Sequence, residues 1–341
     1  MQMKATLRDV AERSGFSITT VSHVLNDVPG KRIAPDTRET IRRVADELAY
    51  RPNQLAQGLR RQRSGTIGFL ADSILTTPHA HKVISGAQDA AAEAGSMLLL
   101  VSTDGRPELE ERGITAFLDR QVDGIVYAAT YHRIVTPPPS LRARPAVLLD
   151  ARTDAAEYPS AVPDEVGSAR TAVAELVRAG HRRIGYLGNV DDIPATAGRL
   201  AGYRQALAEA GLPWQPAWEV AEASESTGGY RAARAVLDRP DRPTALFCFN
   251  DRMALGAYFA VQDLGLAVAL DVSIIGFDDQ EIISEGVHPG LTTMRLPHYE
   301  MGQWGIRTLL SLIDAPSDGP YDPVHFDCPL VRRASVGSPR G

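Results

Sequence analysis

The chain has 341 residues, of which 44% are hydrophobic and 23% are charged, a composition ordinary for a globular protein. Its length predicts two or three domains rather than one small core. No apolar run reaches 18 residues, and the N-terminus lacks a basic start followed by an apolar stretch. Neither a transmembrane helix nor a secretory signal is therefore expected, and we predict a cytoplasmic protein with no membrane partner.

Charge is divided unevenly along the chain. Residues 1–63 contain 12 Lys and Arg against 7 Asp and Glu, a net charge of +5, whereas the remainder carries a net charge of −11. A small basic head (residues 1–63) can bind the phosphates of a nucleic acid, while the large acidic body (the remaining residues) keeps the protein in solution and repels DNA. The charge pattern therefore favours nucleic-acid binding through the first 63 residues.

Three short amphipathic helices are predicted in this head. Thr6 and Ser17 are candidate N-caps, Gly15 can end the first helix in a left-handed turn, and Pro35 suits the first turn of the third helix. The predicted inner faces are Leu7, Val10 and Ala11; Val21, Val24 and Leu25; and Ile41, Val44, Ala45 and Leu48.

The second of these helices has a polar outer face. It is expected to present Ile18, Thr19, Ser22, His23 and Asn26. Three short helices with a tight glycine turn between the first two describe a helix-turn-helix DNA-binding domain. The alternative is a helical hairpin that caps the larger domain, but the basic charge and the polar outer face favour DNA binding.

The segment "RPNQLAQGLRRQRSG" (51–65) has two interpretations. It can be a plain basic linker, or residues 53–60 can form about two helical turns, which are too short to be stable alone. Gly58 weakens such a helix further. The pattern predicts a hinge or linker over residues 53–63, between a DNA-binding domain over 1–52 and a body over 64–341.

Apolar runs alternate with helical segments throughout the body. The predicted strands are "TIGFLA" (66–71), "MLLLVS" (97–102), "GIVYAA" (124–129), "AVLLD" (146–150), "RIGYLG" (183–188), "ALFCFN" (245–250) and "VSIIGFDD" (272–279). Helices are predicted over 82–94, 165–179, 198–210 and 229–237. Continuous apolar strands between helices indicate buried parallel sheets of the α/β class, and the body is long enough for two of them.

Polar residues at the ends of these strands are the candidate ligand contacts, because ligands of open parallel sheets bind beyond the carboxyl ends of the strands. The candidates are Asp150, Arg199, Asn250 and Asp278. Such side chains suit a polyhydroxylated ligand, since each planar group can bond two adjacent hydroxyls. The alternative is that strand-end aspartates only cap the next helix, and we prefer it for Asp251.

No residue pattern indicates an enzyme or a cofactor. The chain lacks GxGxxG or Walker A after the first strand, GxSxG and HExxH. Asp278 and Asp279 are adjacent on a strand and would face opposite sides, so they make a poor acid–base pair. His79 and His81 lack a third ligand for a metal, and Cys248 and Cys328 suit core thiols.

The head and the hinge segment resemble the lactose-repressor (LacI) family of bacterial transcription regulators. The likeness lies in "TLRDVAERSGFSITTVSHVLND" and "APDTRETIRRVADELAYRPNQLAQGLR". It implies base-reading roles for Ile18, Thr19 and His23, although the family commonly has arginine at the last position, so the base read stays open. It also implies a hinge that becomes helical on operator DNA, with Leu59 wedged into the minor groove. The DNA-binding candidates are Thr6, Ser17, Ile18, Thr19, Thr20, Ser22, His23, Asn26, Asn53, Ala56 and Leu59.

The body resembles the ligand-binding core of the same family, which is similar to periplasmic sugar-binding proteins. "GRLAGY", "CFNDRMALGAY", "DVSIIGFDD" and "PGLTTMRLP" carry the likeness. It implies two lobes, one over about 64–162 and 290–318 and the other over about 163–289 and 319–333. The implied effector contacts are His79, Thr130, Asp150, Arg199, Ser224, Asn250 and Asp278.

Two positions depart from the family pattern. Ser224 stands where sugar and purine regulators often carry an aromatic platform, and Tyr127, Phe249 or Trp218 are left as stacking candidates. Ile193 and Ala195 stand where the purine-binding member has polar contacts, which argues against a nucleobase.

Together these features predict a ligand-controlled repressor, with a sugar or sugar derivative as effector and carbohydrate-utilisation genes as targets. A palindromic operator and paired hinges imply a homodimer. A tetramer would need an added C-terminal heptad helix, and the tail after Arg333 shows no such pattern. A transport receptor would need a signal peptide and no basic head, so it is disfavoured.

Overall fold

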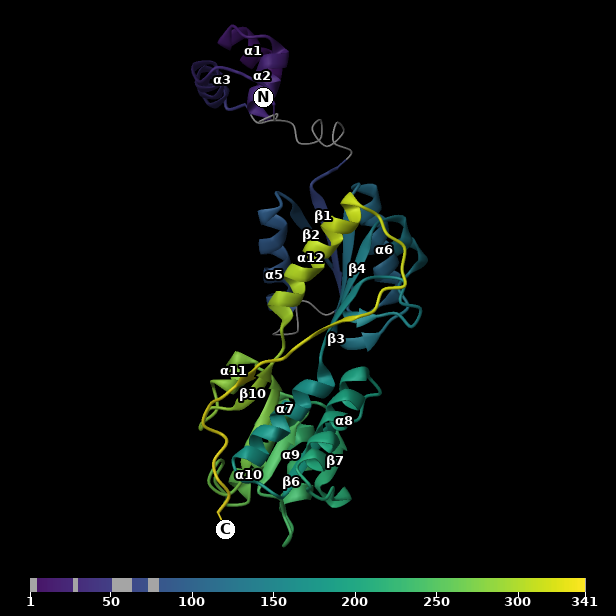
Figure 1. The fold of residues 1–341 in the computed structure, drawn as a ribbon, viewed down its shortest axis with the longest axis vertical. Coiled ribbons are helices and arrows are strands. Elements are labelled where there is room, and N and C mark those ends of the chain that lie inside the picture. Colours follow the sequence, from purple (N-terminus) through teal and green to yellow (C-terminus); the bar gives the residue numbers. More distant parts are fainter. Residues whose placement is uncertain (1–4, 27–29, 51–62, 73–79, 341) are drawn as a thin grey trace. The chain divides into compact units, whose positions relative to one another are not determined.

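A computed structural model describes residues 5–26, 30–50, 63–72 and 80–340 (Figure 1). The chain divides into two units, residues 1–65 and residues 66–341. Within the described ranges, none of the helices has the length and apolar character needed to cross a membrane.

The described part of unit 1 contains three helices, α1 (Leu7–Ser14), α2 (Ile18–Leu25) and α3 (Pro35–Glu47). Their predicted start and stop signals are confirmed. The Thr6 hydroxyl accepts a hydrogen bond from the Asp9 amide, and Gly15 adopts the left-handed conformation with φ of 75°. The Ser17 hydroxyl accepts from the Thr20 amide, and Pro35 is the first residue of α3. These signals hold α1 and α2 in the predicted helix-turn-helix.

The three helices enclose one small core. Val10, Val21, Val24 and Ile41 are fully buried, and the other predicted inner residues pack with them. The prediction that Ser22 faces outward is wrong, because this side chain is only 8% exposed. The Asn26 amide donates to both the Ser22 hydroxyl (3.1 Å) and the Ser22 carbonyl (2.7 Å), which folds the C-cap side chain over the serine.

Unit 2 contains two lobes, each with a six-stranded sheet flanked by helices (Figure 1). The strands of lobe 1 are all parallel, in the spatial order β11 (Val324–Phe326), β5 (Ser160–Pro163), β4 (Ala146–Arg152), β3 (Gly124–Ile134), β1 (Thr66–Ala71) and β2 (Met97–Ser102). Its helices are α5 (Ala80–Glu93), α6 (Pro107–Asp119), α12 (His298–Asp314) and the 3-10 turn Pro139–Ala143.

Successive side chains along the strands of lobe 1 point to opposite faces of the sheet, so an apolar core forms on each face. Phe69 packs on one face of the sheet with residues of α5 and α12, whereas its neighbour Leu70 packs on the other face with α6. The apolar run of β2 is less buried than predicted, since Met97 is 66% and Leu100 is 41% exposed. The reason is topological, because β2 is an edge strand with one neighbour in the sheet.

The strands of lobe 2 have the order β12 (Leu330–Val331), β10 (Thr292–Arg295), β9 (Ser273–Asp278), β8 (Ala245–Cys248), β6 (Ile184–Asn189) and β7 (Glu219–Glu222). All of them are parallel except β12. The helices are α7 (Glu165–Arg178), α8 (Pro194–Glu209), α9 (Ser226–Leu237), α10 (Asp251–Asp263), α11 (Glu281–Ser284) and the 3-10 turn Pro216–Trp218.

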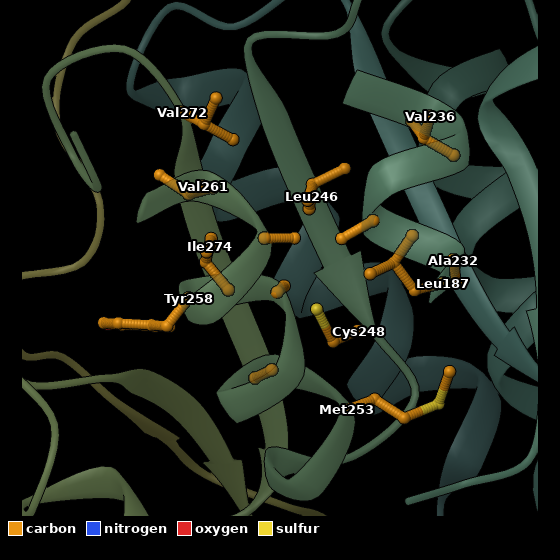
Figure 2. Packing of buried hydrophobic residues seen from close by; sticks show 14 of the residues in the cluster. Leu187, Ala232, Val236, Leu246, Cys248, Met253, Tyr258, Val261, Val272 and Ile274 are labelled. Carbon is orange, nitrogen blue, oxygen red and sulfur yellow. The ribbon is translucent and has the colours of Figure 1, made fainter. Parts of the chain in front are cut away.

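The helices of lobe 2 also form two layers. Helices α7 and α8 pack with Tyr186, Phe247 and Phe277 on one face of the sheet. Helices α9 and α10 bury Leu246, Cys248 and Ile274 with other apolar residues on the opposite face (Figure 2). Cys248 and Cys328 are both buried free thiols, as predicted.

The lobes exchange strands at boundaries that differ from those expected. Strand β10 falls in the range expected for lobe 1, yet it pairs with β9 in the sheet of lobe 2. Strand β11 falls in the range expected for lobe 2, yet it pairs with β5 in lobe 1. Both strands are short and lack a continuous apolar run, so their sequences do not mark the sheet to which they belong.

Close approach of α9 and α10 in lobe 2 requires glycine. A Cβ atom added to Gly256 would lie 2.0 Å from the Ser226 carbonyl oxygen and 2.4 Å from the Tyr230 amide nitrogen. We expect Gly256→Ala to lower the free energy of unfolding by about 1–3 kcal/mol through overpacking, measured by urea denaturation of the full chain. Gly290→Ala, where the added atom meets nothing closer than 3.4 Å, is the matched control. A gain in stability from Gly256→Ala, as helix propensity alone predicts, would contradict this packing.

Candidate functional site

Six of the seven predicted ligand contacts line one cleft between the two lobes of unit 2. The cleft has a volume of about 590 Å³ and lies at the carboxyl ends of strands from both sheets. The predicted residues found there are Thr130, Asp150, Arg199, Ser224, Asn250 and Asp278. The seventh, His79, lies outside the described residues, as do Asn53, Ala56 and Leu59 of the predicted hinge.

Arg199, from α8, lies in the wall of the cleft and is only 4% exposed. Its Nε donates to Glu165 Oε2 at 2.7 Å, and Nη1 donates to the Phe249 carbonyl at 2.5 Å and lies 3.6 Å from Asp278 Oδ1. The guanidinium also stacks over the rings of Phe277 and Phe249, at 3.7 and 4.5 Å from the ring centroids. These contacts fix the cation on the lobe 2 wall.

Burial and charge act in opposite directions on this group. Burial tends to lower the pKa of Arg199, but Glu165 and Asp278 raise it overall, so the guanidinium stays charged. Burial raises the pKa of Glu165, and Arg199 offsets only part of that effect. The ion pair therefore requires both partners, since either charge alone would be buried without compensation.

Asp150 places a carboxylate on the lobe 1 side of the cleft, and only one of its two oxygens has a partner in the described part of the chain. Its Oδ2 lies 3.0 Å from Nε2 of His298, at the start of α12. Its Oδ1 is buried and has no hydrogen-bond partner among the described residues. A buried carboxylate oxygen without a partner can accept a hydrogen bond from a ligand hydroxyl or ammonium group.

The prediction that Asp251 caps the helix after β8 is wrong. Asn250, not Asp251, is the N-cap of α10, with Oδ1 accepting from the Met253 amide at 2.8 Å and Nδ2 donating to the Ser224 carbonyl at 3.0 Å. Asp251 is fully buried, where it accepts from the Gln280 amide and the Thr293 hydroxyl. Burial and then Asp278 raise the pKa of Asp251 well above the ordinary value. The side-chain amide of Asn250 has two N–H donors, and the hydrogen bond to the Ser224 carbonyl uses one of them.

A break in the pairing of β3 with β4 carries further side chains to the cleft. Ala128 pairs with Leu149 but Arg133 pairs with Ala151, so the intervening residues bulge from the ladder. Thr130 donates from both its amide and its hydroxyl to Asp72, which also pairs with Arg133. Tyr131 is 46% exposed at the cleft, beneath the Arg133 guanidinium.

His132, in the same bulge, is 7% exposed, and neither ring nitrogen has a hydrogen-bond partner among the described residues. Nδ1 lies 3.9 Å from Glu165 Oε1 of lobe 2. Burial lowers the pKa of His132 to about 4, against a smaller opposing effect of Asp150. The imidazole is therefore neutral near pH 7.

Sequence reasoning missed several residues of this cleft. They are Asp72, Tyr131, His132, Arg133, Glu165, Asp191, Arg252 and His298. The polar string "TYHR" directly after the apolar run at 124–129 is the signal that could have found the bulge. Of the three stacking candidates, Phe249 lines the cleft. Tyr127 instead donates to Glu110, and Trp218 packs in the core of lobe 2.

The predicted DNA-reading surface of α2 is largely accessible. Ser17, Ile18 and Thr19 are exposed, whereas His23 and Asn26 are half-buried. The hydroxyls of Thr6 and Ser17 serve as helix caps, and the Thr20 hydroxyl lies 2.9 Å from that of Ser17. The exposed surface at the start of α2 thus combines apolar and hydroxyl groups, both suited to the edges of bases.

Comparisons with known proteins match both units. Residues 6–53 match the family "Bacterial regulatory proteins, lacI family", and residues 173–336 match a periplasmic binding protein-like domain. The ribose operon repressor of Haemophilus influenzae is 31% identical over 98% of this chain and 99% of its own.

Two solved structures are similar over almost the whole chain. The lac repressor dimer bound to operator and the anti-inducer ONPF has a TM-score of 0.77 and 26% identity, covering 98% of this chain and all of its own. The transcriptional regulator CelR in complex with cellobiose has a TM-score of 0.69 and 27% identity, covering 97% of this chain and all of its own.

The Arg199 ion pairs predict a large asymmetry between two arginines of α8. Arg199→Ala leaves Glu165 and Asp278 buried without their cation, so the free energy of unfolding should fall by about 3–5 kcal/mol. Arg204→Ala removes a more exposed pair with Glu219 and should cost less than about 1 kcal/mol. Thermal and urea denaturation of the full chain measure the free energy of unfolding of both variants. Equal losses would show that the buried ion pairs contribute no more stability than a surface ion pair.

Proposed function

Since the chain belongs to the lacI family of bacterial regulatory proteins, we propose that it is a ligand-responsive repressor of carbohydrate-utilisation genes in the cytoplasm. In this proposal unit 1 binds a palindromic operator as part of a homodimer, and the cleft of unit 2 binds a sugar effector. The observation that carries it is the presence, in one chain, of a basic helix-turn-helix unit and a polar cleft at the ends of two parallel sheets.

In the head, α2 acts as the recognition helix. Ile18, Thr19 and His23 read base edges in the major groove, and the hydroxyls near the helix starts position the phosphates. The net charge of +5 over residues 1–63 supports this role, because phosphate neutralisation supplies much of the affinity for DNA. The hinge contacts of Asn53, Ala56 and Leu59 remain a prediction from the sequence.

In the body, the effector is a sugar or sugar derivative. The cleft offers carboxylate, amide and imidazole groups, which suit the alternating donors and acceptors of a polyol. Tyr131, which is 46% exposed, supplies aromatic surface for the apolar face of a pyranose or furanose ring. The bound cellobiose of CelR and the name of the ribose operon repressor support the same class of ligand.

The homodimer is supported by the exposed apolar edge of lobe 1. Met97 and Leu100 of β2 leave apolar surface uncovered at the end of the sheet, and such surface favours a protein contact. The lac repressor, similar in fold over 98% of this chain, is a dimer on its operator. Two heads related by a twofold axis require an operator with matching symmetry.

Selection of duplexes from a random-sequence DNA library by the full-length protein tests this function. We expect enrichment of a palindrome. Thr19→Ala should bind the selected duplex about tenfold more weakly, because one good base contact is worth about 1–3 kcal/mol. Thr115→Ala, an exposed helical threonine of lobe 1, is the matched control and should bind like the unmodified chain.

Two results of this selection would count against the proposal. Enrichment of sequences without twofold symmetry would contradict the homodimeric operator complex. Equal losses from Thr19→Ala and Thr115→Ala would contradict the assignment of α2 as the reading helix.

A further inference from the structure

The charges that line the cleft point to a particular class of effector. Seven carboxylates and three arginines are among its lining residues, and no lysine is. The carboxylates are Asp72, Asp104, Asp150, Glu165, Asp191, Glu225 and Asp278. Residues 73–79, which the structure does not describe, contain no Lys, Arg, Asp or Glu, so this balance does not depend on them.

Each of the three arginines is already paired with a carboxylate of the cleft. Arg133 pairs with Asp72, and Arg252 Nη1 lies 3.1 Å from Glu225 Oε1. Arg199 is shared between Glu165 and Asp278 and also donates to a backbone carbonyl. Nε of Arg133 and Nε of Arg252 are buried without hydrogen-bond partners among the described residues, so these donors stay open to a ligand. A ligand anion that reached them would share each cation with the carboxylate already paired to it, and it would meet further carboxylates of the cleft.

Asp150 and His132 offer further open polar atoms in the cleft, and these atoms suit uncharged or cationic groups. Asp150 Oδ1 and the two ring nitrogens of His132 are buried without hydrogen-bond partners among the described residues. The two residues lie side by side, because Arg133 pairs with Ala151 on the adjacent strand and both side chains line the cleft. A carboxylate oxygen accepts only, whereas a neutral imidazole offers one donor and one acceptor.

We propose that this cleft selects an uncharged or amino-substituted sugar and rejects phosphorylated and carboxylated sugars, with Asp150 and His132 as the pair that reads two adjacent ligand groups. This inference rests on the proposed function and specifies the effector that it leaves open. Asp150 accepts from a ligand hydroxyl or ammonium group, and His132 bonds the neighbouring hydroxyl.

The surroundings of His132 keep it from acting as an anion receptor. Asp150 and Arg152 face it from β4, His325 from β11, Glu165 from α7 and Arg199 from α8. Burial lowers the pKa of His132 to about 4 despite the nearby carboxylate, so the ring carries no positive charge near pH 7. A neutral imidazole gives a phosphate or carboxylate no compensation for the acidic wall.

Isothermal titration of the full-length protein with matched sugars tests the selection. The probes are glucose, glucosamine, glucose 6-phosphate and glucuronate, together with ribose and ribose 5-phosphate, and cellobiose and cellobionate. We expect a neutral or amino sugar to bind, and its phosphorylated or carboxylated counterpart to bind at least about a hundredfold more weakly. Equal or tighter binding of an anionic form would overturn this inference and leave the sugar-responsive repressor standing. If none of these sugars binds, the sugar effector and this inference both fail, whatever the DNA selection shows.

Variants of His132 test its part with the sugar that binds. His132→Phe keeps an aromatic ring but removes both nitrogens, and should weaken binding about tenfold or more. His132→Gln retains a donor and an acceptor and should keep more affinity than the phenylalanine variant. The control His288→Gln alters an exposed histidine of lobe 2 that does not line the cleft and should bind normally. Unchanged affinity in His132→Phe, with an intact thermal transition, would remove His132 from the reading pair.

Discussion

A single buried cation, the Arg199 guanidinium, holds the lobe 2 side of the cleft in place. Two carboxylates from different elements, Glu165 at the start of α7 and Asp278 at the end of β9, converge on it. Without a cation, their mutual repulsion and desolvation would drive these elements apart or force protonation. The Phe277 and Phe249 rings enclose the guanidinium, so the same group joins the charged wall of the cleft to the apolar interior.

Two carboxylates of the cleft, and the aspartate that follows one of them, have unusual backbone conformations. Asp150, Asp278 and Asp279 have positive φ angles of 50°, 114° and 55°. Asp150 lies within β4, opposite the irregular stretch of β3, whereas Asp278 ends β9 and Asp279 directly follows it. Aspartate tolerates the left-handed region better than most residues do. Such conformations persist only where surrounding contacts hold them, and they concentrate at binding sites. The strain, the buried charge and the open Asp150 oxygen thus occur together at one edge of the sheets.

Much of this arrangement could be predicted from local sequence. Caps such as Thr6, Ser17 and Gly15 determine their helix ends by contacts within a few residues, and these were confirmed. The long apolar strands were recognisable for the same reason, and their carboxyl ends gave Asp150 and Asp278 as residues of the cleft. Arg199 was found from its place in the helix after the turn that follows one of these strands.

The errors have causes that are not local. The pairing of β10 and β11 depends on three chain crossings between lobes, which no residue in these short strands marks. The exposure of β2 follows from its place at an edge of the sheet. His132 and Tyr131 reach the cleft only because of an irregularity in the β3–β4 ladder, and periodicity along one strand cannot show a break in pairing with another.

The proposed function requires that a sugar bound in the cleft of unit 2 change the affinity of unit 1 for DNA, and linkage makes such coupling reciprocal. The most direct measurement is the affinity of the full-length protein for its selected duplex at increasing sugar concentration, paired with its sugar affinity with and without that duplex. We expect sugar to change the affinity for the duplex by some factor, and the duplex to change the affinity for sugar by the same factor. Binding of both ligands with no effect of either on the other would contradict it.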